Sequence, residues 1–281
     1  MTIKNGLSVD VEDYFHAEAI AAHFGRSSWE MMESRVVENT HRVLDLLGEH
    51  NARATFFVLG WVAERFPKLV REIHGRGHEI GCHSYWHRLI YRLTPEEFRE
   101  DTRRAKDVIE SSSGVKVTGY RAPSFSVTKN SLWALEVLSE LGFEYDSSIF
   151  PIRHDVYGIP DHPRFSCRYE NRGRRIMVEL PISTWRLGNV NLPFGGGGYL
   201  RILPFAYTRQ AFRRVNEGEQ QPAIVYFHPW EFDPEQPRLT VPLRSRLRHY
   251  TNLNRMMGRV TVLLQNYEFV PLCELLGQDI A

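Results

Sequence analysis

Two histidines separated by three residues, His83 and His87, have the spacing in this sequence that points most directly to metal chemistry. If residues 83–87 form a helical turn, both imidazoles lie on one face and can share a metal ion. A chain with 12 histidines can also place two at this spacing by chance. The position of the pair argues for function, because it follows a strand expected at 78–83, where the catalytic face of a β/α barrel would lie.

Three acidic residues, Asp10, Glu12 and Asp13, crowd into four positions at the end of another expected strand. Repulsion and desolvation oppose so much negative charge in one place unless a cation compensates it. A solvated turn, with Asp13 as a helix cap, is the simpler alternative. Beside a divalent cation, one acid can bind the metal while another, left free, acts as a general base toward water.

Two further candidates, Arg121 and His228, also follow expected strands. Arg121 can pair with an acid and keep it ionised and oriented, although a structural salt bridge would have the same sequence signature. His228 comes after an apolar stretch at 223–227, and a single histidine of this kind is more often structural. At a barrel mouth beside a metal, however, it can protonate a leaving amine.

Candidate substrate contacts lie next to these motifs. The glycine run at 195–198 lets the backbone approach a ligand closely, or forms a simple flexible turn. Aromatic faces stack on sugar rings, although most aromatic residues of any protein fill its core. We expect substrate contacts from Tyr85, Trp86, Pro123, Ser124, Asp146, Gly197 and Trp230.

The elements that must position these residues alternate between strand and helix. Apolar, β-prone stretches predict strands at 7–11, 54–59, 78–83, 117–121, 143–147, 176–182 and 223–227. Apolar spacing and capping residues predict helices at 36–49, 67–75, 94–113, 130–141 and 244–267, with one more helix between the last two strands. The alternation predicts an α/β fold with a parallel sheet, and the number of units favours a distorted or incomplete (β/α) barrel.

Composition and missing motifs exclude several classes of protein. The chain has no apolar run of about 18 residues, so a membrane-spanning helix is not expected. Neither a dinucleotide-binding nor a phosphate-binding glycine loop is present. The net charge of +1 implies neither nucleic acid nor an anionic membrane as a bulk electrostatic partner. Three widely spaced cysteines argue against a cysteine metal site, and the N-terminus lacks an apolar leader, so we expect a cytoplasmic protein.

The order of these motifs resembles that of the polysaccharide deacetylase superfamily (carbohydrate esterase family 4). The resemblance rests on the acidic strand end, His-Ser-x-x-His, Arg-x-Pro and a late strand ending in histidine, over roughly residues 7–230. The stretches SVDVEDYF, YRAPSFS, YDSSIFP and FHPWE resemble a bacterial subgroup encoded with exopolysaccharide and exosortase systems. For that subgroup the resemblance implies one catalytic domain over 1–281, in which 151–281 contain a characteristic C-terminal extension packed on the barrel.

The resemblance also implies one divalent metal ion, most often zinc, with cobalt, nickel or iron as alternatives. His83 and His87 match the histidine ligands of the family, Asp10 its catalytic base, Arg121 the residue that orients the base, and His228 the general acid.

The acidic ligand departs from the usual family pattern of two adjacent aspartates, because Val11 follows Asp10 here. The ligand is then either Glu12 or Asp13. Strand alternation puts Glu12 on the same face as Asp10, whereas a chain that leaves the strand after Asp10 would favour Asp13. The sequence leaves both open.

The expected function is removal of N-acetyl groups from an acetylated amino-sugar polysaccharide or its precursor, in exopolysaccharide biosynthesis. The expected partner is an N-acetylated oligo- or polysaccharide, without nucleic acid or membrane insertion, and the oligomeric state stays open. One alternative is a metal-dependent amidase that acts on a small amide or ureide. Another is a non-catalytic carbohydrate-binding barrel, which is disfavoured because the base, both histidines and the late histidine are all present.

Overall fold

A computed structural model describes residues 3–171 and 174–276. In these residues, nine strands form one sheet in the order β10-β1-β2-β3-β4-β5-β7-β6, with β11 also paired to β1. All pairs are parallel except β6 with β7. The strands are β1 (Lys4–Val11), β2 (Thr55–Val58), β3 (Glu79–Cys82), β4 (Gly119–Tyr120), β5 (Tyr145–Asp146), β6 (Cys167–Asn171), β7 (Arg174–Glu179), β10 (Ile224–Phe227) and β11 (Glu268–Val270). A separate hairpin pairs β8 (Thr184–Leu187) with β9 (Val190–Pro193).

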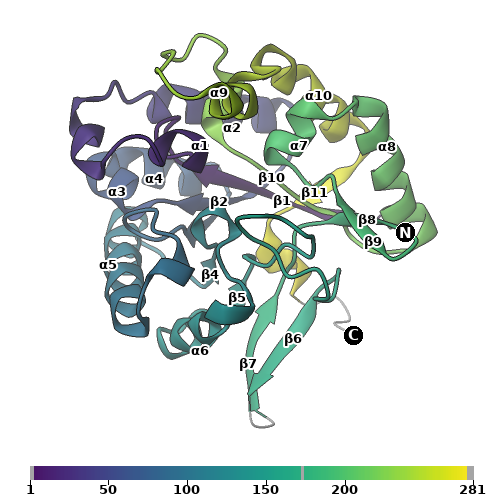
Figure 1. The fold of residues 1–281 in the computed structure, drawn as a ribbon, viewed down its shortest axis with the longest axis horizontal. Coiled ribbons are helices and arrows are strands. Elements are labelled where there is room, and N and C mark those ends of the chain that lie inside the picture. Colours follow the sequence, from purple (N-terminus) through teal and green to yellow (C-terminus); the bar gives the residue numbers. More distant parts are fainter. Residues whose placement is uncertain (1–2, 172–173, 277–281) are drawn as a thin grey trace.

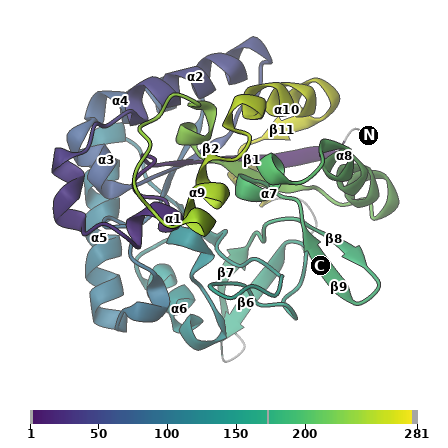
Figure 2. The same ribbon diagram turned by 45° about the horizontal axis from the view of Figure 1, so that its top comes forward.

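Helices surround this sheet, as Figures 1 and 2 show. They are α1 (Glu18–Ala21), α2 (Val36–Glu49), α3 (Gly60–Arg65), α4 (Pro67–Gly75), α5 (Pro95–Ser113), α6 (Trp133–Glu140), α7 (Gly197–Ile202), α8 (Phe205–Arg213), α9 (Leu243–Tyr250) and α10 (Leu253–Asn266). The expected β/α alternation and the distorted barrel are confirmed. Within the described residues, every helix is too short or too polar to cross a bilayer.

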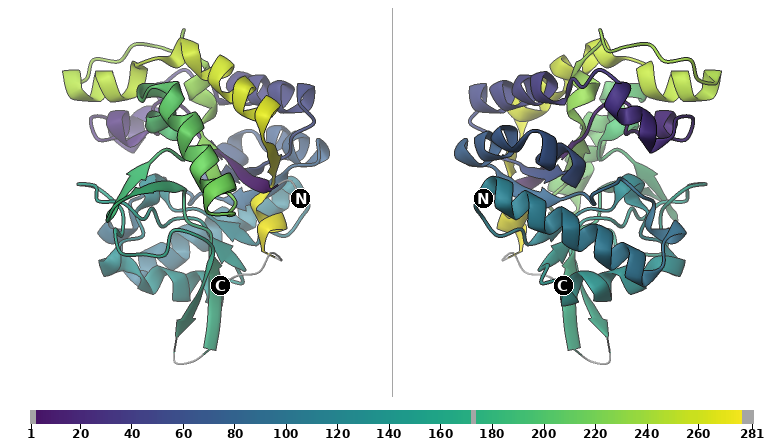
Figure 3. Two further views of the ribbon diagram at one scale, coloured as in Figure 1. Left: turned by 90° about the vertical axis from the view of Figure 1, so that its right-hand side faces the viewer. Right: turned by 90° about the vertical axis from the view of Figure 1, so that its left-hand side faces the viewer.

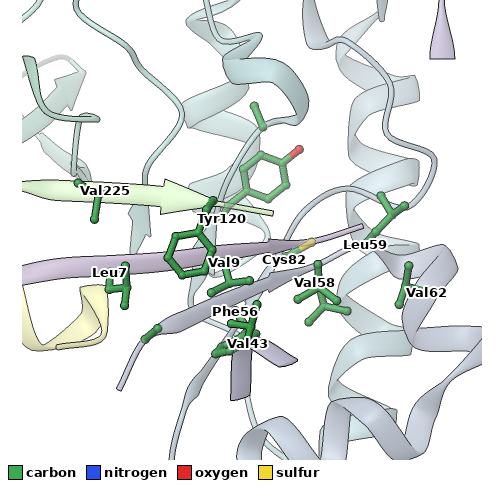
Figure 4. Close-up of a cluster of buried hydrophobic side chains, with 14 of the residues drawn as sticks. Leu7, Val9, Val43, Phe56, Val58, Leu59, Val62, Cys82, Tyr120 and Val225 are labelled. Carbon is green, nitrogen blue, oxygen red and sulfur yellow. The ribbon is translucent and has the colours of Figure 1, made fainter. Parts of the chain in front are cut away.

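Alternation along β1 divides its side chains between two environments. Leu7, Val9 and Val11 face outward into the main apolar core, where they pack with residues of β2 and the surrounding helices (Figure 4). The intervening Ser8 and Asp10 are also buried, but they face the inside of the barrel. The same alternation puts Phe56 into the outer core and Phe57 into a second, inner cluster. Polar groups at the strand ends are therefore held by a rigid apolar frame.

The barrel closes between β7 and β10 through irregular backbone rather than a regular strand pair. Ser183 N–H donates to Ile224 O at 3.1 Å, and Tyr226 N–H donates to Gly195 O at 2.8 Å. Gly196, at φ +130°, forms an isolated bridge with Tyr226. A Cβ atom at Gly196 would lie 1.8 Å from Tyr226 O, so only glycine allows this approach. In the glycine run at 195–198, Gly196 and Gly197 pack against Tyr226 of β10, whereas Gly198 lines the cavity described below.

Two expectations about the C-terminal half differ from the structure. The helix expected over 244–267 is two helices, because Thr251 and Asn252 leave the helical path and Asn252 adopts φ +57°. Arg201 explains the break: it donates to the carbonyls of His249 (3.0 Å) and Thr251 (2.7 Å), which a continuous helix would use itself. The segment 151–175, in which no strand or helix was expected, contains β6 (Cys167–Asn171).

The contact at Gly196 gives a stability prediction. Gly196→Ala is expected to lower the free energy of unfolding by about 2–4 kcal/mol, because the new methyl group collides with strand backbone that cannot move without opening the barrel seam. Chemical denaturation measures the change. Gly258→Ala is the matched control: its Cβ would meet nothing within 4 Å on helix α10, so it is expected to raise stability slightly. Equal effects at the two positions would contradict this account of barrel closure.

Candidate active site

Glu12, His83 and His87 bring three ligand atoms within 4.8 Å of one another at the carboxyl ends of β1 and β3. Glu12 Oε2 lies 2.8 Å from His87 Nε2 and 4.0 Å from His83 Nε2. The short approach to His87 lacks hydrogen-bond geometry, so Glu12 Oε2 is a buried oxygen without a hydrogen-bond partner. One carboxylate and two imidazoles are a donor set of catalytic zinc sites. These residues therefore fit a divalent metal ion.

The protonation of this group also suits a metal. His83 Nδ1–H donates to Arg121 O at 2.8 Å, which leaves the lone pair of Nε2 facing Glu12. Burial lowers the pKa of His83 to about 4, so the ring is neutral at neutral pH. Burial opposes charge on Glu12, but His87, His228 and His83 outweigh it and hold the pKa of Glu12 well below its ordinary value. A carboxylate and a neutral imidazole are the forms that bind metal.

The two histidines converge in a way that the sequence did not predict. Residues 83–87 are not a helical turn but a loop, in which Ser84 and His87 have φ of +66° and +51°. Asp101 of α5 fixes this loop, because its carboxylate accepts from Ser84 Oγ (2.7 Å) and from the N–H groups of Tyr85 (2.8 Å) and Trp86 (3.2 Å). The two imidazoles therefore converge as expected, but through a loop and not through a helical turn. The sequence analysis did not identify Asp101 as the anchor of this loop.

Asp10 faces the same space as Glu12 and is held by Arg121. Arg121 Nη1 donates to Asp10 Oδ1 at 2.9 Å and to Ser8 Oγ at 2.6 Å. The other side of the guanidinium donates to Ser147 O (3.0 Å) and Ser147 Oγ (2.8 Å). Arg121 is fully buried, and its guanidinium lies 4.4 Å from the ring centre of Phe57. This arrangement fixes the direction of the Asp10 carboxylate.

His228 approaches both acids from β10, with Nε2 3.9 Å from Asp10 Oδ2 and 3.7 Å from Glu12 Oε1. Its Nδ1 is 3.0 Å from Glu231 Oε2, and Glu231 pairs in turn with buried Arg201. Burial opposes the charged imidazolium, but Glu231 and the two other acids outweigh burial and raise the pKa of His228 to about 9. His228 therefore carries a proton at neutral pH and can donate it.

Asp13 points away from the histidines. Its carboxylate accepts from Ser34 Oγ (2.6 Å) and from Arg35 N–H (3.0 Å), at the start of α2. Burial raises the pKa of Asp13 to about 6. The structure therefore brings Glu12 to the paired histidines and uses Asp13 to cap the backbone of a helix.

A cavity of about 400 Å³ opens onto these groups. Of the expected substrate contacts in the described chain, Ser124 and Trp230 are among the residues that line it. Trp230 stacks between His228 and His249, with ring centres 5.1 and 4.2 Å away. Its Nε1–H donates to Glu12 Oε1 at 3.2 Å. Trp230 thus fixes the metal-site carboxylate as well as the cavity wall.

The other expected contacts are not among the residues that line the cavity. Tyr85 donates to Glu64 Oε2 at 2.6 Å, and Trp86 packs against Tyr85 and Trp29. Pro123 is buried, and Gly197 packs against the ring of Tyr226.

Asp146 is also fully buried and supports the wall from behind. It accepts from Ser148 Oγ at 2.5 Å, and Ser148 Oγ accepts from Ala122 N–H at 2.7 Å. Burial raises its pKa to about 6.

Several cavity residues were missed because they lie outside the motifs that the sequence offered in the C-terminal half. They include Tyr157, Tyr199, Ile202, Arg248 and His249. Glu231 and Arg201, which support His228, were also missed. Glu231 had a sequence signal, since it lies three residues after His228 in a quoted motif.

Comparison with known proteins identifies the class of fold and site described above. Residues 26–145 match a family model described as polysaccharide deacetylase, and residues 147–277 match a domain of unknown function named DUF3473. The resemblance to the polysaccharide deacetylase superfamily is thus confirmed over residues 26–145. His228, Glu231 and Arg201 all lie in the segment whose family model has no assigned function.

Curated relatives resemble only part of the chain. A peptidoglycan-N-acetylglucosamine deacetylase of Bacillus cereus is 36% identical over 36% of this chain and 37% of its own length. The peptidoglycan-N-acetylmuramic acid deacetylase PdaC of Bacillus subtilis is 36% identical over 30% of this chain and 18% of its own length. A peptidoglycan deacetylase of Helicobacter pylori is 32% identical over 38% and 36%. The matches thus span less than two fifths of these relatives.

Solved structures support the same fold over nearly the whole chain. A crystal structure assigned to a polysaccharide deacetylase from Mycobacterium smegmatis has a TM-score of 0.62 at 19% identity, covering 97% of this chain and 88% of that one. A pseudoenzyme of carbohydrate esterase family 4 from Bacillus anthracis has a TM-score of 0.53 at 17% identity, covering 100% and 67%. At such identities the likeness concerns fold alone.

The loop anchored by Asp101 gives a prediction about metal affinity. Asp101→Asn is expected to weaken zinc binding by about 10-fold, because an amide cannot accept all three hydrogen bonds that hold the loop between the histidines. Competition against a chromophoric chelator measures the affinity. Asp107→Asn on the same helix, which removes an exposed ion pair with Arg103, is the control and is expected to leave affinity unchanged. Unchanged affinity in Asp101→Asn would show that the loop does not need this anchor.

Proposed function

We propose that this protein is a metal-dependent deacetylase that hydrolyses N-acetyl groups of an amino-sugar polysaccharide or its precursor. One observation carries the proposal: a Glu12-His83-His87 group with a buried, unsatisfied carboxylate oxygen faces a cavity shared with Asp10 and His228. The match of residues 26–145 to the polysaccharide deacetylase model and the deacetylase activities of the partial relatives support the reaction class.

Glu12, His83 and His87 would hold the metal, and zinc suits this donor set, with cobalt, nickel or iron as alternatives. The ion would supply Lewis acidity to water and to the acetyl carbonyl oxygen. Asp10, oriented by Arg121, takes the proton from water as it attacks the amide carbon. His228, protonated and backed by Glu231, gives its proton to the departing amine, and acetate leaves.

The oxyanion that forms needs a backbone N–H donor, and the candidates nearest the site in sequence are those of residues 85–87 and 121–124. Tyr85 and Trp86 donate to Asp101, Arg121 N–H donates to Cys82 O, and Ala122 N–H donates to Ser148 Oγ. Ser124 lines the cavity at φ +50°, and we assign its N–H as the oxyanion donor.

The biological setting is part of the same proposal. The motif wording and the second matched model in 147–277 support a role in exopolysaccharide biosynthesis.

The pseudoenzyme among the structural neighbours shows that this fold does not guarantee catalysis, so the case for an enzyme rests on the residues named above. Acetate release from chitooligosaccharides, compared with ammonia release from small amides, separates a sugar deacetylase from a small-amide amidase. Full activity after chelator treatment would refute metal dependence.

Removal of either imidazole tests the ligand assignment. His83→Ala and His87→Ala are each expected to lower bound metal and acetate release together, because three protein ligands become two. Metal content by elemental analysis and turnover are measured on the same samples. His162→Ala, outside the cavity-lining residues, is the histidine control and is expected to keep both. Normal metal content in both ligand variants would refute the assigned site.

Removal of the proton donor is expected to separate catalysis from metal binding. His228→Ala should reduce turnover by roughly 10²–10⁴-fold with metal content unchanged, since a positioned acid contributes about that much. Loss of the metal in this variant would instead make His228 a ligand and overturn its assignment as the acid.

A further inference from the structure

Helix α9 presents an exposed surface of leucine and arginine beside the cavity. Leu243 and Leu247 are 67% and 57% exposed and lie one helical turn apart. Arg244 and Arg246 are exposed on the same helix. Ile202, at the end of α7, is 46% exposed and lines the cavity. We call Leu243, Arg244, Arg246, Leu247 and Ile202 the basic-apolar rim.

The rim lies at the mouth of the candidate active site. Arg248 and His249, which continue α9, line the cavity together with Ile202. Figure 3 shows α9 projecting from the same side of the molecule as the β8–β9 hairpin. The tip of this hairpin carries two further exposed apolar residues, Leu187 and Val190, each 59% exposed. Exposed apolar residues are therefore present on both α9 and the β8–β9 hairpin.

The charge of α9 is strongly positive over a short distance. Its sequence LRSRLRHY has three arginines and no acidic residue. Arg244 lies 3.4 Å from Asp155, an exposed pair of small energetic weight. Arg248 Nη2 lies 3.2 Å from His154 Nε2. Burial lowers the pKa of His154, so this histidine does not neutralise the arginine. The net charge of +1 for the whole chain conceals this local concentration.

We propose that the basic-apolar rim docks on an anionic membrane surface and holds the cavity mouth against the lipid headgroups. Leucines at the surface of a basic helix gain free energy by entering the acyl boundary, while arginines reach the anionic headgroups. A polyanionic polysaccharide would explain the arginines but not the leucines, because sugars are contacted by aromatic faces and polar groups. The docking is peripheral and needs no spanning helix.

Docking would also narrow the substrate class. A cavity held at the headgroup layer is positioned for an N-acetylated sugar carried on a membrane-anchored precursor, rather than for a finished polymer in free solution. This substrate class rests on the proposed deacetylase function, whereas docking itself does not.

Vesicle binding tests the docking surface independently of catalysis. The full chain is expected to cosediment with phosphatidylcholine vesicles that contain phosphatidylglycerol, less with phosphatidylcholine alone, and less again as salt increases. Arg244→Gln/Arg246→Gln and Leu243→Ser/Leu247→Ser are each expected to lower the partition coefficient by roughly 10-fold. Arg209→Gln/Arg213→Gln on exposed α8 is the control with the same charge change, and is expected to bind as the unmodified chain does.

Three outcomes would overturn the proposal: no cosedimentation with either vesicle, equal losses in the α8 control, or an arginine-dependent binding to dextran sulfate that is indifferent to the leucines. A concentration-dependent dimer in analytical ultracentrifugation that Leu243→Ser/Leu247→Ser disrupts would assign the rim to a second copy instead. Acetate release from a soluble chitooligosaccharide is expected to persist in the rim variants. Absence of acetate release from the unmodified chain, with the soluble chitooligosaccharide and with a vesicle-anchored N-acetylated sugar precursor alike, would refute the deacetylase proposal while leaving the docking result intact.

Discussion

Asp10 of β1 and Glu12, which follows the end of that strand, are both buried carboxylates, and the surrounding residues compensate their negative charge. Desolvation makes an uncompensated buried carboxylate costly. Asp10 receives a guanidinium that is itself fully buried and held by Ser8 and Ser147. Glu12 receives imidazoles and the indole N–H of Trp230, yet one of its oxygens stays unsatisfied. A divalent cation is the natural partner for that oxygen.

Asp10 and Glu12 have different partners, and this difference separates the chemical roles of the two carboxylates. Asp10 is paired with the guanidinium of Arg121, which orients its carboxylate while the carboxylate still faces the cavity. Glu12 is surrounded by nitrogen atoms whose lone pairs can bind metal, one of them fixed by the His83 hydrogen bond to Arg121 O. Arg121 therefore contacts both parts of the site: its side chain binds Asp10, and its backbone carbonyl accepts a hydrogen bond from His83. A change at Arg121 would disturb both groups together.

The sequence predicted the helices well because their ends depend on residues that are close together in the sequence. Helices α2, α4 and α5 begin and end where apolar spacing and capping residues indicated, and the capping box at Thr94 is present. Asp10, His83, His87 and Arg121 lie around one space because parallel strands end at the same edge. The loop conformation at 83–87, its anchor Asp101 and the break between α9 and α10 depend on contacts distant in sequence, which periodicity does not report.

The C-terminal segment is part of the barrel and not an attachment to it. Strand β10 pairs with β1 in register Ser8↔Tyr226 and Val9↔Phe227, which brings His228 beside Asp10 and Glu12. Arg201 connects the two functions of this segment, because the same guanidinium pairs with Glu231 behind His228 and binds three carbonyls at the end of α9. The helix that forms the cavity rim is thus fixed to the residue that orients the proton donor. Removal of β10 would expose the edge of β1 and take His228 away from Asp10 and Glu12, so the late strand and the acidic residues of the first strand end depend on each other.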